Sequence, residues 1–119
     1  MKIVYASGAS GIHMPYEFCA IKTPEDFERL KEVYQQDANG TYHYVGKDDC
    51  SIVWDTTDIN YFAGNKIRAV YPEYKQLNIL RGSNQVEIAK MNTFIDAVRA
   101  WANSTNPDPW DGTLDSIVP

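Results

Sequence analysis

The sequence NQVEIAKMNTFIDAVRAWAN, residues 84–103, carries the longest helical pattern of the chain and decides its fold class. Its apolar side chains recur at spacings of three and four residues, which brings them to one face of an α-helix. These side chains are Ile88, Met91, Ile95, Val98 and Ala102. Asn84, with Glu87 three residues later, resembles a capping box, a pattern typical of a helix start. We therefore predict a helix over residues 85–103, the longest of the chain.

Further helical patterns lie before this helix. From about Asp58 the apolar spacing becomes that of a helix, and Gly64-Asn65 is a weak point that permits either one helix or two short ones. Pro72 prevents this region from continuing, but it can open a new helix that Gly82 would stop.

Another helix is predicted near the amino terminus. Thr23-Pro24 combines an N-cap hydroxyl with a proline at the first helical position. Apolar side chains follow at helical spacing for about three turns, at Phe27, Leu30 and Tyr34. Asn39-Gly40 would close this helix.

Short extended segments occupy the rest of the amino-terminal half. Residues 2–6 and 16–21 read as strands, separated by a turn or mobile loop over residues 7–11. Residues 41–45 are β-branched and aromatic, and a polar break separates them from residues 50–54, which predicts a β-hairpin. We therefore expect an α+β fold, in which a small antiparallel sheet from the amino-terminal half is packed with three to four helices.

The carboxyl-terminal residues depart from these patterns. Pro107 and Pro109 prevent the last helix from continuing, and the residues around them are rich in Asp and include Trp110. We expect a single α+β domain over residues 1–103, followed by an irregular tail over residues 104–119.

Length and charge narrow the class of protein. A chain of 119 residues suits one domain with one modest core. The net charge of −5 repels a polyphosphate backbone, so nucleic acid is not an expected partner. Because no apolar run is long enough for a membrane span or a secretory signal, we expect a cytoplasmic protein with no membrane partner. Cys19 and Cys50 are expected as reduced thiols on strands.

Two patterns suggest a cofactor, but neither has the spacing that the cofactor requires. Residues 8–11, Gly-Ala-Ser-Gly, look like the start of a dinucleotide-binding motif, yet His13-Met14-Pro15 stands where a helix must follow. Four side chains suit zinc but do not form the close pairs of a structural zinc site; they are His13, Cys19, His43 and Cys50. We expect no cofactor and no metal.

The carboxylates give no stronger case for catalysis. Asp55 and Asp58 fall at a predicted strand-to-helix junction and are expected to be solvated caps. A small enzyme would need a pocket that gathers His13 or His43 with Cys19 or a carboxylate, and this stays an alternative.

Aromatic residues are unusually frequent. Eight Tyr, four Phe and three Trp are more than a core of this size needs, so some rings are expected to be partly exposed. Phe62 and Trp101 lie near helical stripes and suit packing. Tyr71, Tyr74 and Trp110 flank prolines, where chains run at the surface, and Tyr and Trp are frequent at the centres of protein interfaces. This pattern favours a protein that binds another protein and is not an enzyme.

The sequence YPEYKQLNIL of residues 71–80, followed by MNTFIDAVRAW of residues 91–101, resembles small tail-assembly or tail-fibre-assembly chaperones of tailed phages and prophages. The likeness covers about residues 61–119, including a short tail rich in Pro, Trp and Asp. It implies a non-enzymatic protein that binds a tail or tail-fibre polypeptide in the cytoplasm of the infected or lysogenic cell. The expected partner-binding residues are Tyr71, Tyr74, Lys75, Gln76, Trp101 and Trp110.

A second function class competes with the assembly chaperone. A small acidic phage protein can also inhibit a host protein by covering a basic surface. Acidic residues clustered on one exposed face would favour the inhibitor, whereas an exposed aromatic groove would favour the chaperone. The sequence leaves open whether the chain forms homo-oligomers.

Overall fold

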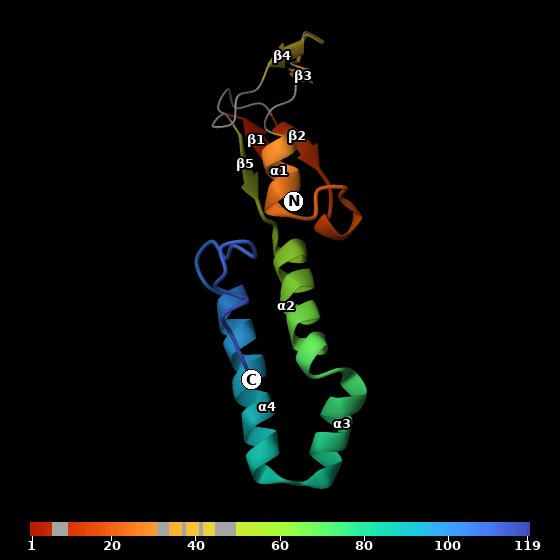
Figure 1. The fold of residues 1–119 in the computed structure, drawn as a ribbon, viewed down its shortest axis with the longest axis vertical. Helices are drawn as coiled ribbons and strands as arrows, with labels where there is room; N and C mark the ends of the chain where they lie inside the picture. The colour runs from red at the N-terminus through yellow and green to blue at the C-terminus, as the bar shows by residue number, and fades with distance from the viewer. Residues whose placement is uncertain (6–9, 31–33, 37, 41, 45–49) are drawn as a thin grey trace. The chain divides into compact units, whose positions relative to one another are not determined.

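The computed structural model describes residues 1–5, 10–30, 34–36, 38–40, 42–44 and 50–119. Its contacts divide the chain into two compact units, Met1–Asp58 and Ile59–Pro119. The first unit contains the strands and one short helix, and the second is helical, so the α+β class is confirmed (Figure 1). Residues 104–119, expected as a tail, belong to the second unit. The expectation of one domain over residues 1–103 stays a prediction.

A three-stranded antiparallel sheet organises the first unit. β1 (Lys2–Tyr5) lies in the centre, between β2 (Ser10–His13) and β5 (Cys50–Val53) (Figure 1). Ile3 pairs with Ile52 across β1 and β5, and Ile3 is fully buried. The strand predicted over residues 2–6 is confirmed over residues 2–5, while residue 6 lies outside the described residues, and a strand beginning at Cys50 is confirmed as well.

The predicted β-hairpin is wrong. β5 pairs with β1, while β4 (Tyr42–Tyr44) pairs antiparallel with β3 (Tyr34–Gln36) in a separate two-stranded sheet. Turn residues between two strands show where each strand ends. They do not show which strand it pairs with, because strand pairing depends on residues far apart in the sequence.

The same pairing shortens the first predicted helix. α1 spans Pro24–Leu30, and Tyr34, expected on the third turn, lies in β3. Here cross-strand pairing outweighs the apolar spacing that favours a helix. The predicted start is confirmed, because Thr23 Oγ1 accepts the N–H of Asp26 over 3.2 Å and the Asp26 carboxylate accepts the N–H of Thr23 over 3.2 Å.

Two extended segments are placed differently from the prediction. Residues 10 and 11, expected in a turn, belong to strand β2, and residues 7–9 lie outside the described residues. Residues 16–21, expected as a strand, begin instead with the 3-10 helix η1 (Tyr16–Phe18). Cys19 therefore caps a turn and is not on a strand, whereas Cys50 begins β5.

The second unit contains α3 (Glu73–Gly82), α4 (Gln85–Ala102) and all of α2 (Thr56–Val70) after its first three residues. α2 is one helix that passes through Gly64-Asn65. α3 starts after Pro72 and ends at Gly82, as predicted. α4 confirms the longest predicted helix, and the Asn84 side chain caps it by accepting two backbone N–H groups. No helix in the described part of the chain has the length and apolarity needed to cross a membrane.

The core of the second unit lies along one face of α4. Its buried residues recur at spacings of three and four, as a helix packed on one side requires; they are Met91, Phe94, Val98 and Trp101. The carboxyl-terminal residues join this core, because the Trp101 indole N–H donates to Thr113 Oγ1 over 3.1 Å and Leu114 is only 5% exposed.

We expect Leu114→Ala to lower the free energy of unfolding of the second unit by about 2 kcal/mol or more, because it removes a buried side chain. Val118→Ala is the matched control, since Val118 is 74% exposed. The measurement is thermal and chemical denaturation followed by circular dichroism. Equal, small effects of the two substitutions would show that the carboxyl-terminal residues do not contribute to the core.

Candidate functional site

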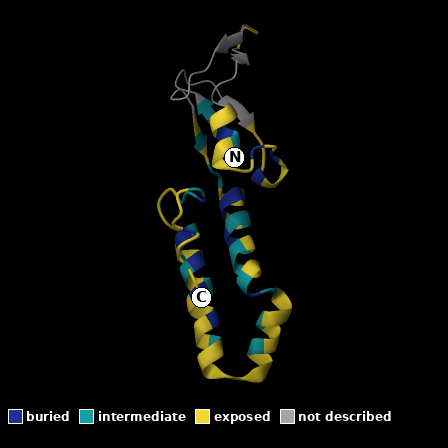
Figure 2. Ribbon diagram, viewed as in Figure 1, coloured by how far each residue is buried: buried dark blue, intermediate teal, exposed yellow. Residues whose placement is uncertain are grey.

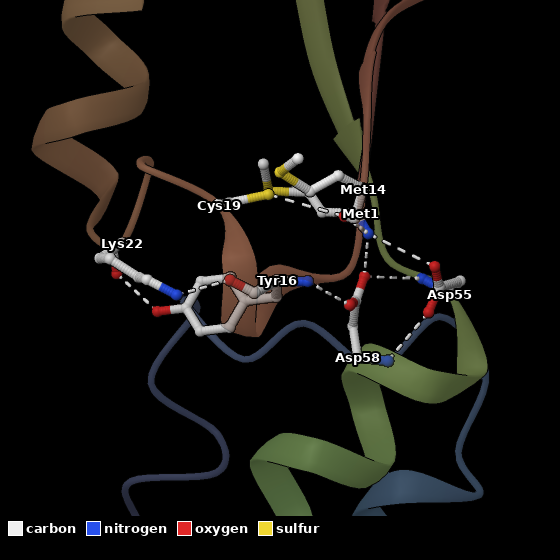
Figure 3. Close-up of polar contacts among 7 residues, drawn as sticks. All are labelled: Met1, Met14, Tyr16, Cys19, Lys22, Asp55 and Asp58. Atoms are coloured by element: carbon white, nitrogen blue, oxygen red, sulfur yellow. Dashed lines mark hydrogen bonds and ion pairs between the residues drawn. The ribbon is translucent and has the colours of Figure 1, made fainter.

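A buried charge cluster lies at the end of the first unit (Figure 3). The N-terminal ammonium of Met1 forms an ion pair with the Asp58 carboxylate, and a second ion pair with Asp55 Oδ2 at 3.4 Å. It also donates to the carbonyl oxygen of Met14 over 2.9 Å. Met1 and Asp58 are buried, with 0% and 1% of their side chains exposed, whereas the Asp55 side chain is 44% exposed.

Asp58 is held by the start of helix α2. The Asp58 N–H donates to Asp55 Oδ1 over 2.9 Å, and Asp58 Oδ2 faces the Asp55 N–H at 3.5 Å, which is the reciprocal arrangement of a capping box. Asp58 Oδ1 also accepts the N–H of Tyr16 over 2.7 Å. The predicted cap role is confirmed, but the expectation that Asp58 is solvated is wrong. Its carboxylate joins three segments that lie far apart in the sequence.

The neighbouring loop is fixed by Tyr16 and Lys22. The Tyr16 hydroxyl donates to the Lys22 carbonyl over 2.7 Å, and the Lys22 ammonium donates to the Tyr16 carbonyl over 2.6 Å. The Lys22 ammonium also lies 4.6 Å from the centre of the Tyr16 ring. The ring in turn meets Trp54 edge-on, at 5.7 Å between ring centres. These contacts hold the Tyr16 N–H where Asp58 accepts it.

The thiol beside the cluster does not suit nucleophilic chemistry. Burial raises the pKa of the Cys19 thiol, and the thiol donates to the Met14 carbonyl at 3.6 Å. A thiol that keeps its proton is a poor nucleophile. The amine is held in ion pairs, and the carboxylate of Asp58 is fully engaged. We therefore interpret the role of the cluster as structural: its ion pairs and hydrogen bonds stabilise the first unit.

The candidate acids, bases and metal ligands are placed as follows. Burial acts to raise the pKa of Asp55, but the Asp58 N–H, the Met1 ammonium and His13 together hold it below the ordinary range of an aspartate. His13 is exposed. The side chains of His43 and Cys50 lie outside the described residues. Among the side chains that are described, no three His, Cys, Asp or Glu residues form a group that could hold a metal ion.

Two of the expected partner-binding rings are buried in the second unit. Tyr71 is 5% exposed and packs at 5.6 Å between ring centres against Phe94, and Trp101 is 8% exposed. The side-chain amide of Gln76 donates to the Tyr71 carbonyl over 2.7 Å, and the Lys75 ammonium lies 5.3 Å from the centre of the Tyr71 ring. Tyr71, between α2 and α3, and Trp101, on the buried face of α4, therefore belong to the core of the second unit.

The other two expected rings are accessible to different degrees. Trp110 is half-buried, and its backbone N–H donates to Asp108 Oδ1 over 2.8 Å. Tyr74 is 69% exposed.

Tyr74 belongs to a row of exposed apolar side chains on helix α3. Leu77 is 55% exposed and Leu80 is 52% exposed, and no residue of α3 is buried. Figure 2 shows this helix coloured mostly as exposed. A spacing of three residues brings the side chains to one side of the helix. We call Tyr74, Leu77 and Leu80 the α3 face.

Sequence reasoning missed the α3 face because a stripe of apolar residues has the same spacing whether it is covered or exposed. The pattern located the helix, but Leu77 and Leu80 were not among the expected partner-binding residues. The spacing of the apolar residues does not separate these two cases.

We expect Asp58→Asn to destabilise the first unit by about 3 kcal/mol, because it leaves the Met1 ammonium buried without its principal counter-charge. An Asn side chain still offers an oxygen to the Tyr16 N–H, so this hydrogen bond can be kept while the negative charge is removed. Asp55→Asn is the control and should cost much less, because Asp55 is 44% exposed. Hydrogen exchange of the amides of Tyr16 and strand β1 measures the effect. Equal losses of protection in the two variants would contradict the ion-pair account.

The lowered pKa of Asp55 predicts a pH dependence of the first unit. A carboxylate whose pKa is lower in the folded state stabilises that state above the unfolded pKa, about 3.9 for Asp, and loses this contribution as the pH falls through the folded pKa. We expect the stability of the wild type to fall more steeply than that of Asp55→Asn below about pH 4. Parallel pH profiles of the two proteins, measured by amide exchange or denaturation, would count against it.

Comparison of the chain with protein-family models, with curated proteins and with solved structures finds no match. The resemblance of residues 71–80 and 91–101 to phage tail-assembly chaperones therefore stays a prediction from the sequence.

Proposed function

We propose that the chain is a non-catalytic protein-binding module that acts as an assembly chaperone for a tail or tail-fibre polypeptide in the host or lysogen cytoplasm. The observation that carries this proposal is the α3 face, where three large apolar side chains of one helix are exposed. Apolar side chains gathered on an exposed surface favour association with another protein.

The α3 face suits a client that exposes apolar surface before it assembles. Each square ångström of apolar surface removed from water contributes about 25 cal/mol, so even a small contact favours binding. The net charge of −5 supports solubility of the complex. Fibrous tail proteins would need such cover, since unpaired strand edges and apolar surface lead to misassembly.

The burial of the aromatic residues limits which of them can contact the client. Tyr74 and Leu77 lie in the stretch that resembles the chaperones, and both are exposed. Lys75 and Gln76 contact the Tyr71 ring and carbonyl, so their role is to fix the start of helix α3. We place client contact on Tyr74, Leu77 and Leu80, with Trp110 as a further candidate.

The chemistry of the first unit supports a non-catalytic role. Its buried amine is paired and its buried thiol has a raised pKa. The exposed apolar row on α3 favours the chaperone over an inhibitor that covers a basic surface, which would depend on acidic side chains.

Co-expression with a tail or tail-fibre polypeptide tests the proposal. We expect the wild type to raise the soluble yield of that polypeptide several-fold, and Tyr74→Ala with Leu77→Ser to remove most of the gain, because the double variant loses apolar contact. Val86→Ser is the control: Val86 is 79% exposed but lies on α4, outside the α3 face.

The melting temperature of each variant separates binding from folding. The double variant should melt close to the wild type, because both side chains are exposed. A client yield that does not change when the protein is co-expressed, or a double variant as effective as the wild type, would contradict the proposal.

A further inference from the structure

The α3 face is symmetric about Leu77. Tyr74 and Leu80 stand three residues before and after Leu77, and Glu73 and Arg81 stand four residues before and after it. All five side chains are exposed. At 100° per residue they occupy one side of the helix, within an arc of about 120°. An acidic residue thus opens the apolar row and a basic residue closes it.

We propose that the α3 face of one molecule pairs with the α3 face of a second copy, the two helices running antiparallel about a two-fold axis at Leu77. In this arrangement Leu77 meets Leu77 of the second copy, and Tyr74 meets Leu80 of the second copy. Glu73 faces Arg81 of the second copy, and the symmetry repeats this pair. A parallel arrangement would place Glu73 beside Glu73 and Arg81 beside Arg81, which like-charge repulsion opposes.

The size of the contact sets the strength of the dimer. Helix α3 has ten residues and is about 15 Å long, so three apolar side chains from each copy form the centre of the interface. Such a contact falls below the roughly 1,200 Å² that marks the weak end of specific interfaces. The dimer is therefore weak and depends on protein concentration.

Pairing with a second copy goes beyond the proposed function but uses the same surface. The dimer covers the α3 face in the absence of a client, and a client replaces the second copy. The two ideas fail separately, because dimerisation is measured on the protein alone and client binding is measured by co-expression.

Disulfide cross-linking tests the antiparallel register. In the full chain carrying Cys50→Ser, Leu77→Cys should form a disulfide-linked dimer under mild oxidation, because position 77 meets its own copy at the axis. Tyr74→Cys and Leu80→Cys should cross-link poorly when each is alone but efficiently when the two are mixed. Val86→Cys is the control for random collisions. Cross-linking of Tyr74→Cys alone as efficient as that of Leu77→Cys would overturn the register.

Charge exchange tests the ion pairs by sedimentation equilibrium. Glu73→Arg and Arg81→Glu should each raise the dissociation constant of the dimer about 10-fold, because each creates two like-charge contacts. The combined variant should return to within about threefold of the wild type, since the pairs are restored in reverse.

The Glu73→Arg variant separates specific pairing from the general repulsion between two negatively charged copies. Glu73→Arg changes the net charge from −5 to −3, so general repulsion alone would make the dimer tighter, whereas the proposed pairing makes it weaker. A wild type that stays monomeric at millimolar concentration, or a combined variant no better than the single variants, would overturn the proposal. Circular dichroism confirms that the helices are retained in each variant.

Discussion

The ion pair between the Met1 ammonium and the Asp58 carboxylate is the interaction on which the arrangement of the first unit depends. Two opposite charges are removed from water at this point, and each is costly without the other. Asp58 also accepts the Tyr16 N–H, so one carboxylate joins the start of strand β1, the start of η1 and the start of helix α2. The charged groups of the cluster therefore hold these segments together.

Helix α3 differs from this buried cluster because its apolar side chains are exposed to solvent. It is fixed at its start by Gln76 and Lys75 against Tyr71, but none of its residues is buried. The fold therefore places an apolar row on this helix and leaves it exposed. A row of this kind is available to a client or to a second copy, and its charges favour an antiparallel second copy.

Local signals in the sequence located most helices and strands but did not show which strands pair with one another. The Asn84 cap and the apolar spacing behind it located α4, and Thr23 located the start of α1, because capping and periodicity are local properties. The pairing of β5 with β1 and the placement of Tyr34 in β3 were missed, because they depend on residues distant in the sequence. For the same reason the charge cluster and the burial of Tyr71 were missed, whereas the helical spacing of Trp101 already indicated packing.

The central claim is that this chain binds another polypeptide through the α3 face. Methyl NMR of the leucines and valines, recorded while the unlabelled tail or tail-fibre polypeptide is added, tests it most directly. The account predicts shift changes at Leu77 and Leu80 with little change at Val86. Changes confined to other methyl groups, or none at saturating client, would contradict it.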